Sequence, residues 1–269
     1  MNWRSFHHPD WCLPVVRRRL AEEFLETLEL TAKILMTRGR YLAWGHSYPN
    51  RRAYFMATHR LRKQGLIAYR RRGGKEPALY LTAKGEERLS DVSRPQRFWD
   101  MPWKGIWYVL VYDVPESNRS YRNSLRGFLK RMRMGYLQGS VWVSARDIRA
   151  EFSDLAEAAA ASDYAFLFEA RTVLGLRPEV VVRSSWDMDL LRKSQEWFCE
   201  VCEENLHRVA SGQCAGPALG GLAREAMAGY EAVMERDPLL PRALWPSGYA
   251  GEQAYRLHRR LQSEIAKRL

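Results

Sequence analysis

The sequence lacks the segments that mark membrane and exported proteins. Its 269 residues contain no run of about 18 apolar residues, the length that crosses a bilayer. The first residues, MNWRSFHHPDW, contain no apolar core of a signal peptide. Cysteine is scarce, and its four residues are unevenly spaced, which is typical of reduced thiols and not of a disulfide framework. We therefore expect a cytoplasmic protein that does not associate with a membrane.

The common signatures of catalysis and of phosphate binding are also missing. The sequence contains no glycine-rich phosphate loop, no nucleophile elbow and no HExxH motif. We therefore expect neither an enzyme nor a bound cofactor.

Acidic residues are missing from one long stretch near the N-terminus. Between Leu30 and Lys75 there are 12 basic residues and no acidic one. Residues 1–97 hold 20 Lys and Arg against 9 Asp and Glu, whereas residues 98–191 hold 12 against 12 and residues 192–269 hold 11 against 10. The net charge of +12 therefore comes almost entirely from the first third. One basic segment on an otherwise neutral chain is typical of nucleic-acid binding, the alternative being a merely solvated face.

The basic segment has the element order of a winged helix. Apolar periodicity predicts one helix over Ala21–Gly39 and a second over Asn50–Gly65. A short strand at Leu66–Tyr69, a basic turn at residues 70–75 and a returning strand at Ala78–Leu81 follow. The second helix should bury the residues of its apolar face, which are Tyr54, Ala57, Thr58 and Leu61.

This order of elements predicts sequence-specific binding to double-stranded DNA. A helix fits the major groove, where arginine reads guanine edges, and cations on a hairpin reach neighbouring phosphates. We expect the groove to be contacted by Arg51, Arg52, His59, Arg62 and Lys63. We expect phosphates to be held by Arg70, Arg71, Arg72 and Lys75. The alternative is a winged helix that binds another protein.

The remainder of the chain predicts an alternating domain followed by a helical one. Strands are expected at residues 107–113, 136–138, 141–144 and 164–168, with helices at 120–134 and 147–161, the first helix ended by Gly135. This βαββαβ order is the ferredoxin-like arrangement. Trp186–Leu269 is helical and aromatic, with a linker near Ser211–Gly221. The expected fold class is α+β, with a winged helix-turn-helix at residues 20–95, a ferredoxin-like domain at 100–183 and a helical domain at 186–269.

Two segments resemble a known family. Trp103–Ser144 combines a Trp-x-x-x-Trp start, a strand ending in Tyr-Asp-Val-Pro, an arginine-rich helix and Gly-Tyr-Leu-Gln-x-Ser-Val-Trp-Val. It resembles the middle domain of the PaaX-type transcriptional regulators, which repress phenylacetate catabolism, and Asp237–Leu261 is similar to the tail of that family. The resemblance implies a ligand-responsive repressor of a catabolic operon, a homodimer that an aromatic acyl-CoA releases from DNA. The operator, the effector and the choice between repression and activation stay open.

Asp113 allows a different function. The family's middle domain resembles the small ferredoxin-like nucleases of CRISPR adaptation, which carry a metal-binding carboxylate where Asp113 ends its strand. With Glu116, or with Asp113 of a second chain, it can hold Mg²⁺, so the alternative function is a metal-dependent nuclease. We expect instead that Asp113 caps the following turn or pairs with Arg119 or Arg122.

The cysteines allow a zinc site, which we do not expect. Cys199 and Cys202 are three residues apart, with His207 and Cys214 beyond them. Zinc ligand pairs usually lie on turns, whereas Trp197–Leu206 has the pattern of a continuous helix. Core packing of the cysteines is therefore the preferred interpretation, and no metal is assigned.

Overall fold

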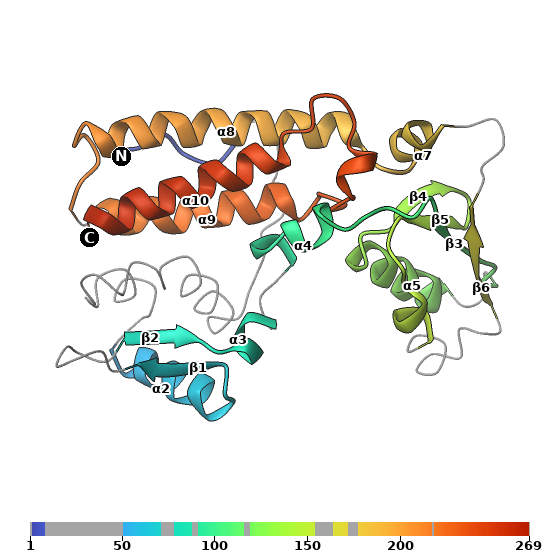
Figure 1. The fold of residues 1–269 in the computed structure, drawn as a ribbon, viewed down its shortest axis with the longest axis horizontal. Coiled ribbons are helices and arrows are strands. Elements are labelled where there is room, and N and C mark those ends of the chain that lie inside the picture. Colours follow the sequence, from blue (N-terminus) through green and yellow to red (C-terminus); the bar gives the residue numbers. More distant parts are fainter. Residues whose placement is uncertain are drawn as a thin grey trace. The chain divides into compact units, whose positions relative to one another are not determined.

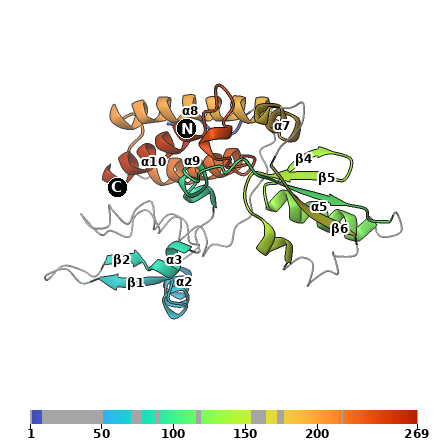
Figure 2. The same ribbon diagram turned by 45° about the vertical axis from the view of Figure 1, so that its right-hand side comes forward.

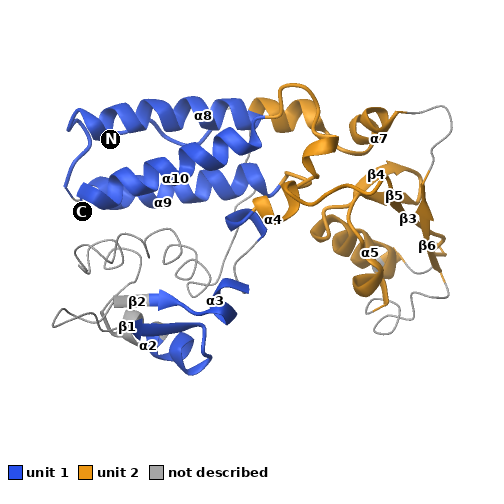
Figure 3. Ribbon diagram, viewed as in Figure 1, with its two compact units in different colours: residues 1–94, 194–235, 250–269 blue, residues 95–193, 236–249 orange. Residues whose placement is uncertain are grey.

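A computed structural model shows the protein as a mixture of helices and strands, which confirms the α+β class (Figure 1). The structure describes residues 2–8, 51–70, 78–87, 91–115, 119–153, 164–171, 177–216 and 218–268. The expected helix over Ala21–Gly39 lies outside them. The chain forms two compact units, one of residues 1–94, 194–235 and 250–269, the other of residues 95–193 and 236–249 (Figure 3).

A helix and a hairpin follow one another in the basic segment, as predicted. Helix α2 spans Arg51–Lys63, and strands β1 (Ile67–Arg70) and β2 (Ala78–Leu81) pair antiparallel. The helix stops because Gly65 adopts a φ of +74° and the Leu66 N–H donates to the Leu61 carbonyl at 3.0 Å. This helix end and both strands confirm the sequence prediction.

A short helix after the hairpin ties its end to the end of α2. Helix α3 spans Ala83–Glu87 and is followed by the 3-10 turn η1 (Asp91–Ser93). The Thr82 hydroxyl donates to the Gly65 carbonyl at 2.6 Å and accepts the Gly85 N–H at 3.0 Å. A side chain at Gly85 would meet the Leu66 carbonyl oxygen, so only glycine allows α3 to approach so closely. The sequence Leu-Thr-Ala-Lys-Gly therefore fixes the hairpin against α2.

The second unit contains a four-stranded sheet with the predicted ferredoxin-like topology. Strands β3 (Trp107–Tyr112), β4 (Gly135–Gln138), β5 (Val141–Ser144) and β6 (Ala165–Ala170) have the order β4-β5-β3-β6, and all neighbours are antiparallel. Helix α5 (Arg119–Arg131) connects β3 to β4, with β5 inserted between them. Residues 149–153 begin the second predicted helix, and its remainder lies outside the described residues.

The two faces of this sheet pack against different elements (Figure 2). Alternate β3 residues Tyr108, Leu110 and Tyr112 lie in one core cluster with Leu125 and Leu129 of α5. The opposite face is covered by helix α7 (Pro178–Ser185) and by the segment around the 3-10 turn η4 (Arg242–Leu244). The residues buried there are Trp107, Val143, Val181, Val182, Met188, Leu191, Leu240 and Leu244.

The expectation that Gly135 ends a helix was wrong. Helix α5 ends at Arg131, and Arg133 takes the left-handed turn with a φ of +58°. Gly135 instead begins β4, where an added Cβ would lie 2.5 Å from the Ser185 Cβ and 2.7 Å from the Trp186 ring. The glycine allows the end of α7 to approach the strand closely.

The C-terminal part is helical, as predicted. Its long elements are helices α8 (Met188–Ala210), α9 (Ala218–Met234) and α10 (Gly251–Arg268). A short helix earlier in the chain, α4 (Gln96–Trp99), belongs to the second unit. Helix α9 already begins at Ala218, so the expected linker near Ser211–Gly221 extends too far. None of the helices in the described part of the chain combines the length and the apolar character needed to cross a membrane.

Candidate functional site

Helix α2 separates a buried face from a basic one. Thr58 and Leu61 are 4% and 2% exposed, as predicted for the inward face. His59, Arg62 and Lys63 are all exposed. The helix has no acidic residue in its first turn, and its last turn is basic. The expected groove-facing residues whose side chains are described therefore lie at the surface.

Two exposed residues extend this surface and were not among those predicted. Met56 and Arg60 are exposed, and with His59 and Lys63 they follow the i, i+3, i+4, i+7 spacing of one helix face. That spacing is the sequence signal that would have identified them. Arg62 lies toward the hairpin, with its guanidinium carbon 5.7 Å from the Tyr69 ring centroid. Among the side chains that the structure describes, this face is basic and includes the apolar Met56.

The other predicted contact residues are placed only in part. Arg51 and Arg52 lie in α2, and Arg70 ends β1. Arg71, Arg72 and Lys75 lie outside the described residues.

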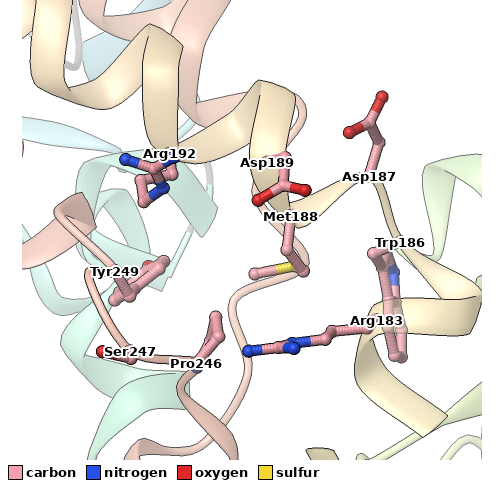
Figure 4. A pocket seen from close by; sticks show the side chains of 9 residues that line it. All are labelled: Arg183, Trp186, Asp187, Met188, Asp189, Arg192, Pro246, Ser247 and Tyr249. Atoms are coloured by element: carbon pink, nitrogen blue, oxygen red, sulfur yellow. The ribbon is translucent and has the colours of Figure 1, made fainter. Parts of the chain in front are cut away.

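A cavity of about 240 Å³ in the second unit is a candidate site for a small molecule (Figure 4). It is formed by the end of α7, the start of α8 and the loop before α10. Its lining residues are Arg183, Trp186, Asp187, Met188, Asp189, Arg192, Pro246, Ser247 and Tyr249.

A buried carboxylate shapes the loop side of this cavity. Asp237 is fully buried, and its two oxygens accept the Leu239 N–H at 2.7 Å and the Tyr249 hydroxyl at 2.6 Å. Gly248 adopts a φ of +79°, and an added Cβ would lie 3.0 Å from Arg192 Cδ. Asp237 therefore has a structural role, which is to hold residues 246–249 at the cavity.

The cavity combines aromatic rings with guanidinium groups. Trp186 and Tyr249 provide the rings, and Arg183 and Arg192 provide the positive charges. Figure 4 shows Arg183 extending toward Pro246 and Asp187 pointing away. The Asp187 carboxylate caps α8 by accepting the Leu190 N–H at 3.0 Å. The lining thus offers rings to an aromatic group and the Arg183 guanidinium to an anionic one, and it also contains the Asp189 carboxylate.

Asp113 lies exposed directly after β3. Its N–H donates to the Tyr164 carbonyl at 2.8 Å, and Arg122 donates to the Val114 carbonyl at 2.5 Å. Glu116 lies outside the described residues. Within the described ranges, no three His, Cys, Asp or Glu residues come close enough together to hold a metal ion.

The three cysteines in the described part of the chain pack in the core, as predicted. Cys199 is 5% exposed, and Cys202 and Cys214 are fully buried. Burial raises the pKa of the Cys199 thiol to about 12, and it raises the pKa of Cys202 well above its usual value. His207 is exposed on α8. The buried thiols are therefore protonated and fill the core as small apolar side chains do.

The fold and these sites define an α+β protein that joins a basic helix and hairpin, a ferredoxin-like sheet and a set of long C-terminal helices. Two family models match it. The model of the PaaX protein central Cas2-like domain matches residues 100–182, and that of the PaaX-like protein C-terminal domain matches residues 186–268. Because the matches together cover more than half of the chain, it belongs to the PaaX-like proteins. This confirms the resemblance found in the sequence.

Other comparisons add little. The search of curated proteins gave no match. Among solved structures, the uncharacterized protein Rv0674 from Mycobacterium tuberculosis is similar at 18% identity and a TM-score of 0.49, covering 97% of this chain and 91% of that chain. This likeness is too low to support an argument about function.

Proposed function

We propose that the protein is a cytoplasmic transcriptional regulator that binds double-stranded DNA through α2 and the hairpin that follows it. The observation that carries this proposal is the exposed basic face of α2, on which His59, Arg60 and Lys63 lie. Membership of the PaaX-like proteins supports a regulator over an enzyme. The winged helix-turn-helix at residues 20–95 is part of the proposal, as is phosphate binding by Arg70, Arg71, Arg72 and Lys75.

The physical basis is the match between this face and the major groove. Arginine recognises guanine with two hydrogen bonds, and an apolar side chain such as Met56 suits the thymine methyl group. The Thr82 bonds fix the hairpin to the end of α2, so both elements meet DNA as one surface. Cations on the hairpin then add affinity that depends on salt and not on sequence.

The experiment is a genome-wide map of bound sites followed by titration of the purified protein on the best site. We expect specific binding that exceeds binding to scrambled DNA by about a thousandfold or more at physiological salt. The affinity should fall steeply with salt. Equal binding to both DNAs, or none, would refute the proposal and favour a winged helix that binds another protein.

We propose further that the regulator is a homodimer released from DNA by an aromatic acyl-CoA, and that the acyl-CoA binds at the cavity of Figure 4. The rings of Trp186 and Tyr249 suit the aromatic acyl group, and Arg183 suits an anionic group of CoA.

The effector proposal is tested with phenylacetyl-CoA as the probe and acetyl-CoA as its non-aromatic control. Phenylacetyl-CoA should quench tryptophan fluorescence and release the operator. Arg183→Ala should weaken both effects, whereas Arg177→Ala, an exposed arginine outside the cavity, should not. Sedimentation tests the dimer. Equal responses to the two thioesters, or an unaffected Arg183→Ala variant, would contradict the assignment.

A further inference from the structure

The first residues of the chain are bound to helix α9 by a single carboxylate. Glu225 accepts the Ser5 hydroxyl at 2.5 Å and the Phe6 N–H at 2.7 Å on Oε1, and the Trp3 indole N–H at 2.7 Å on Oε2. Burial opposes ionisation of Glu225, but these hydrogen bonds outweigh it and lower its pKa below the usual value. A charged acceptor with three donors is a specific attachment.

Helix α8 binds the same segment through its backbone. The Asn205 side chain accepts the Arg4 N–H and donates to the Arg4 carbonyl, both at 2.8 Å. Asn205 itself is fully buried. An amide that satisfies both polar groups of one residue recognises extended backbone in the way a neighbouring strand does.

Two glycines of α9 make room for the aromatic residues of the segment. A Cβ at Gly221 would lie 2.8 Å from the Trp3 ring, and one at Gly229 would lie 2.8 Å from Phe6. Gly221, Glu225 and Gly229 are four residues apart and share one helix face. Phe6 is 1% exposed against this face. The helix therefore has a groove shaped for an aromatic, extended segment.

The same helix also holds a residue that follows the hairpin and α3. The Tyr230 hydroxyl, next to Gly229, donates to the Val92 carbonyl at 2.9 Å, and Val92 is 2% exposed. Phe198 of α8 joins the two attachments, because its ring lies 5.3 Å from Phe6 and 5.9 Å from Tyr230. The part of the chain between residues 8 and 91 is therefore attached to α9 at both of its ends.

We infer that α9 holds the chain both before and after the proposed DNA-binding elements, at residues 2–8 and at Val92, and that residues 2–8 are a clasp that sets operator affinity. This inference rests on the proposed function. In a homodimer, two attachments per chain limit the freedom of each DNA-binding domain, which favours simultaneous contact with two half-sites. Opening the clasp restores that freedom. It should weaken binding to a full operator and leave binding to a single half-site unchanged.

The test uses full-length Glu225→Gln, which keeps the size of the side chain but points an amide N–H₂ at donors. The matched control is Glu200→Gln, an exposed carboxylate of α8. A second variant, Gly229→Ala, displaces Phe6 while favouring the helix. Hydrogen exchange of residues 2–8 measures the clasp without DNA, and titrations on a full site and a half-site measure its consequence.

We expect faster exchange at residues 2–8 in both clasp variants and full-site binding that is weaker by up to about tenfold. The coupling cannot exceed the free energy of the lost attachment, which for Glu225→Gln is about that of one charge-assisted hydrogen bond. Half-site binding and the control should match the wild type. Rapid exchange at residues 2–8 in the wild type would overturn the inference but not the proposed function. The same holds if a variant opens the clasp and its full-site affinity is unchanged. A wild type that binds neither DNA would overturn the proposed function, and the coupling with it.

Discussion

The phenol ring of Tyr230 stacks on the imidazole of His258, with the ring centroids 4.2 Å apart and the planes 4° from parallel. His258 is 2% exposed, and its Nδ1 has no hydrogen-bond partner among the described residues. Burial lowers the pKa of His258 to about 3, so the imidazole is neutral at physiological pH. The residue that binds Val92 therefore rests on a histidine that must stay uncharged.

Stability should consequently fall in mild acid. The folded pKa lies below the ordinary value, so the unfolded chain takes up a proton first as the pH drops from 6.5 toward 3. The free energy of unfolding then decreases across that window, by about 2 kcal/mol between pH 7 and pH 5. Urea unfolding at both pH values measures it. His258→Phe should remove this loss, and the exposed His207→Gln should retain it. A loss that persists in His258→Phe would assign the effect to other groups.

Two glycines of the second unit should respond in opposite directions to alanine. Gly135→Ala places a methyl group against Ser185 and Trp186, and it should cost about 1–3 kcal/mol because a closely packed contact must open. Gly127 lies within α5, where the nearest atom to an added Cβ is 3.5 Å away, so Gly127→Ala should stabilise by up to about 1 kcal/mol. Thermal unfolding measures both. Equal effects would mean that α7 does not approach β4 this closely in solution.

The cations on the exposed face of α2 should contribute more to DNA affinity than exposed cations elsewhere in the chain. Arg60→Ala and Lys63→Ala should each weaken operator binding, and a lost phosphate contact should reduce the slope of log K against log salt by about 0.9. A lost base contact should instead reduce discrimination by about 1–3 kcal/mol. Lys84→Ala, an exposed cation of α3, is the control. Equal effects of all three substitutions would indicate general attraction to DNA and no defined docking face.

The elements that were predictable from sequence share strong local patterns. The strands Ala78–Leu81 and Val141–Ser144 agree with prediction to the residue, because proline, threonine or serine marks the ends of these short apolar runs. Helix α7 was missed because Val180, Val181 and Val182 are β-branched and favour strands. Burial of Val181 and Val182 against the sheet overrides that preference.

Sites formed by distant residues were not predictable. The cavity joins residues 183–192 to residues 246–249, and no local pattern relates these segments. The clasp likewise joins Phe6 to Gly229, and no local pattern relates these two residues. Gly135 shows the related ambiguity of a single residue type. A glycine after a helix signals a stop as readily as a close approach of another element, and only the position of Ser185 distinguishes the two.

The nuclease alternative makes a prediction about Asp113. A hydrolytic metal site needs several carboxylate or imidazole ligands and a positioned water. Asp113 is exposed, and in the described part of the chain it does not belong to any group of three His, Cys, Asp or Glu ligands. We therefore expect purified protein to cleave neither DNA nor RNA with Mg²⁺ or Mn²⁺, and EDTA to leave operator binding unchanged.

The decisive comparison is wild type against Asp113→Asn, assayed side by side on DNA and RNA with each metal. Asparagine keeps the size of the side chain but is a much weaker metal ligand, so the variant separates a chemical role of the carboxylate from a structural one. We expect both proteins to be inactive as nucleases and to bind the operator alike, with any difference confined to folding or dimerisation. Trace cleavage by both proteins alike would indicate a contaminating nuclease. Cleavage by the wild type that is lost in Asp113→Asn would instead place a metal at the end of β3, shared with Glu116 or with a second chain. The protein would then be a nuclease, and its basic helix would serve to hold the substrate.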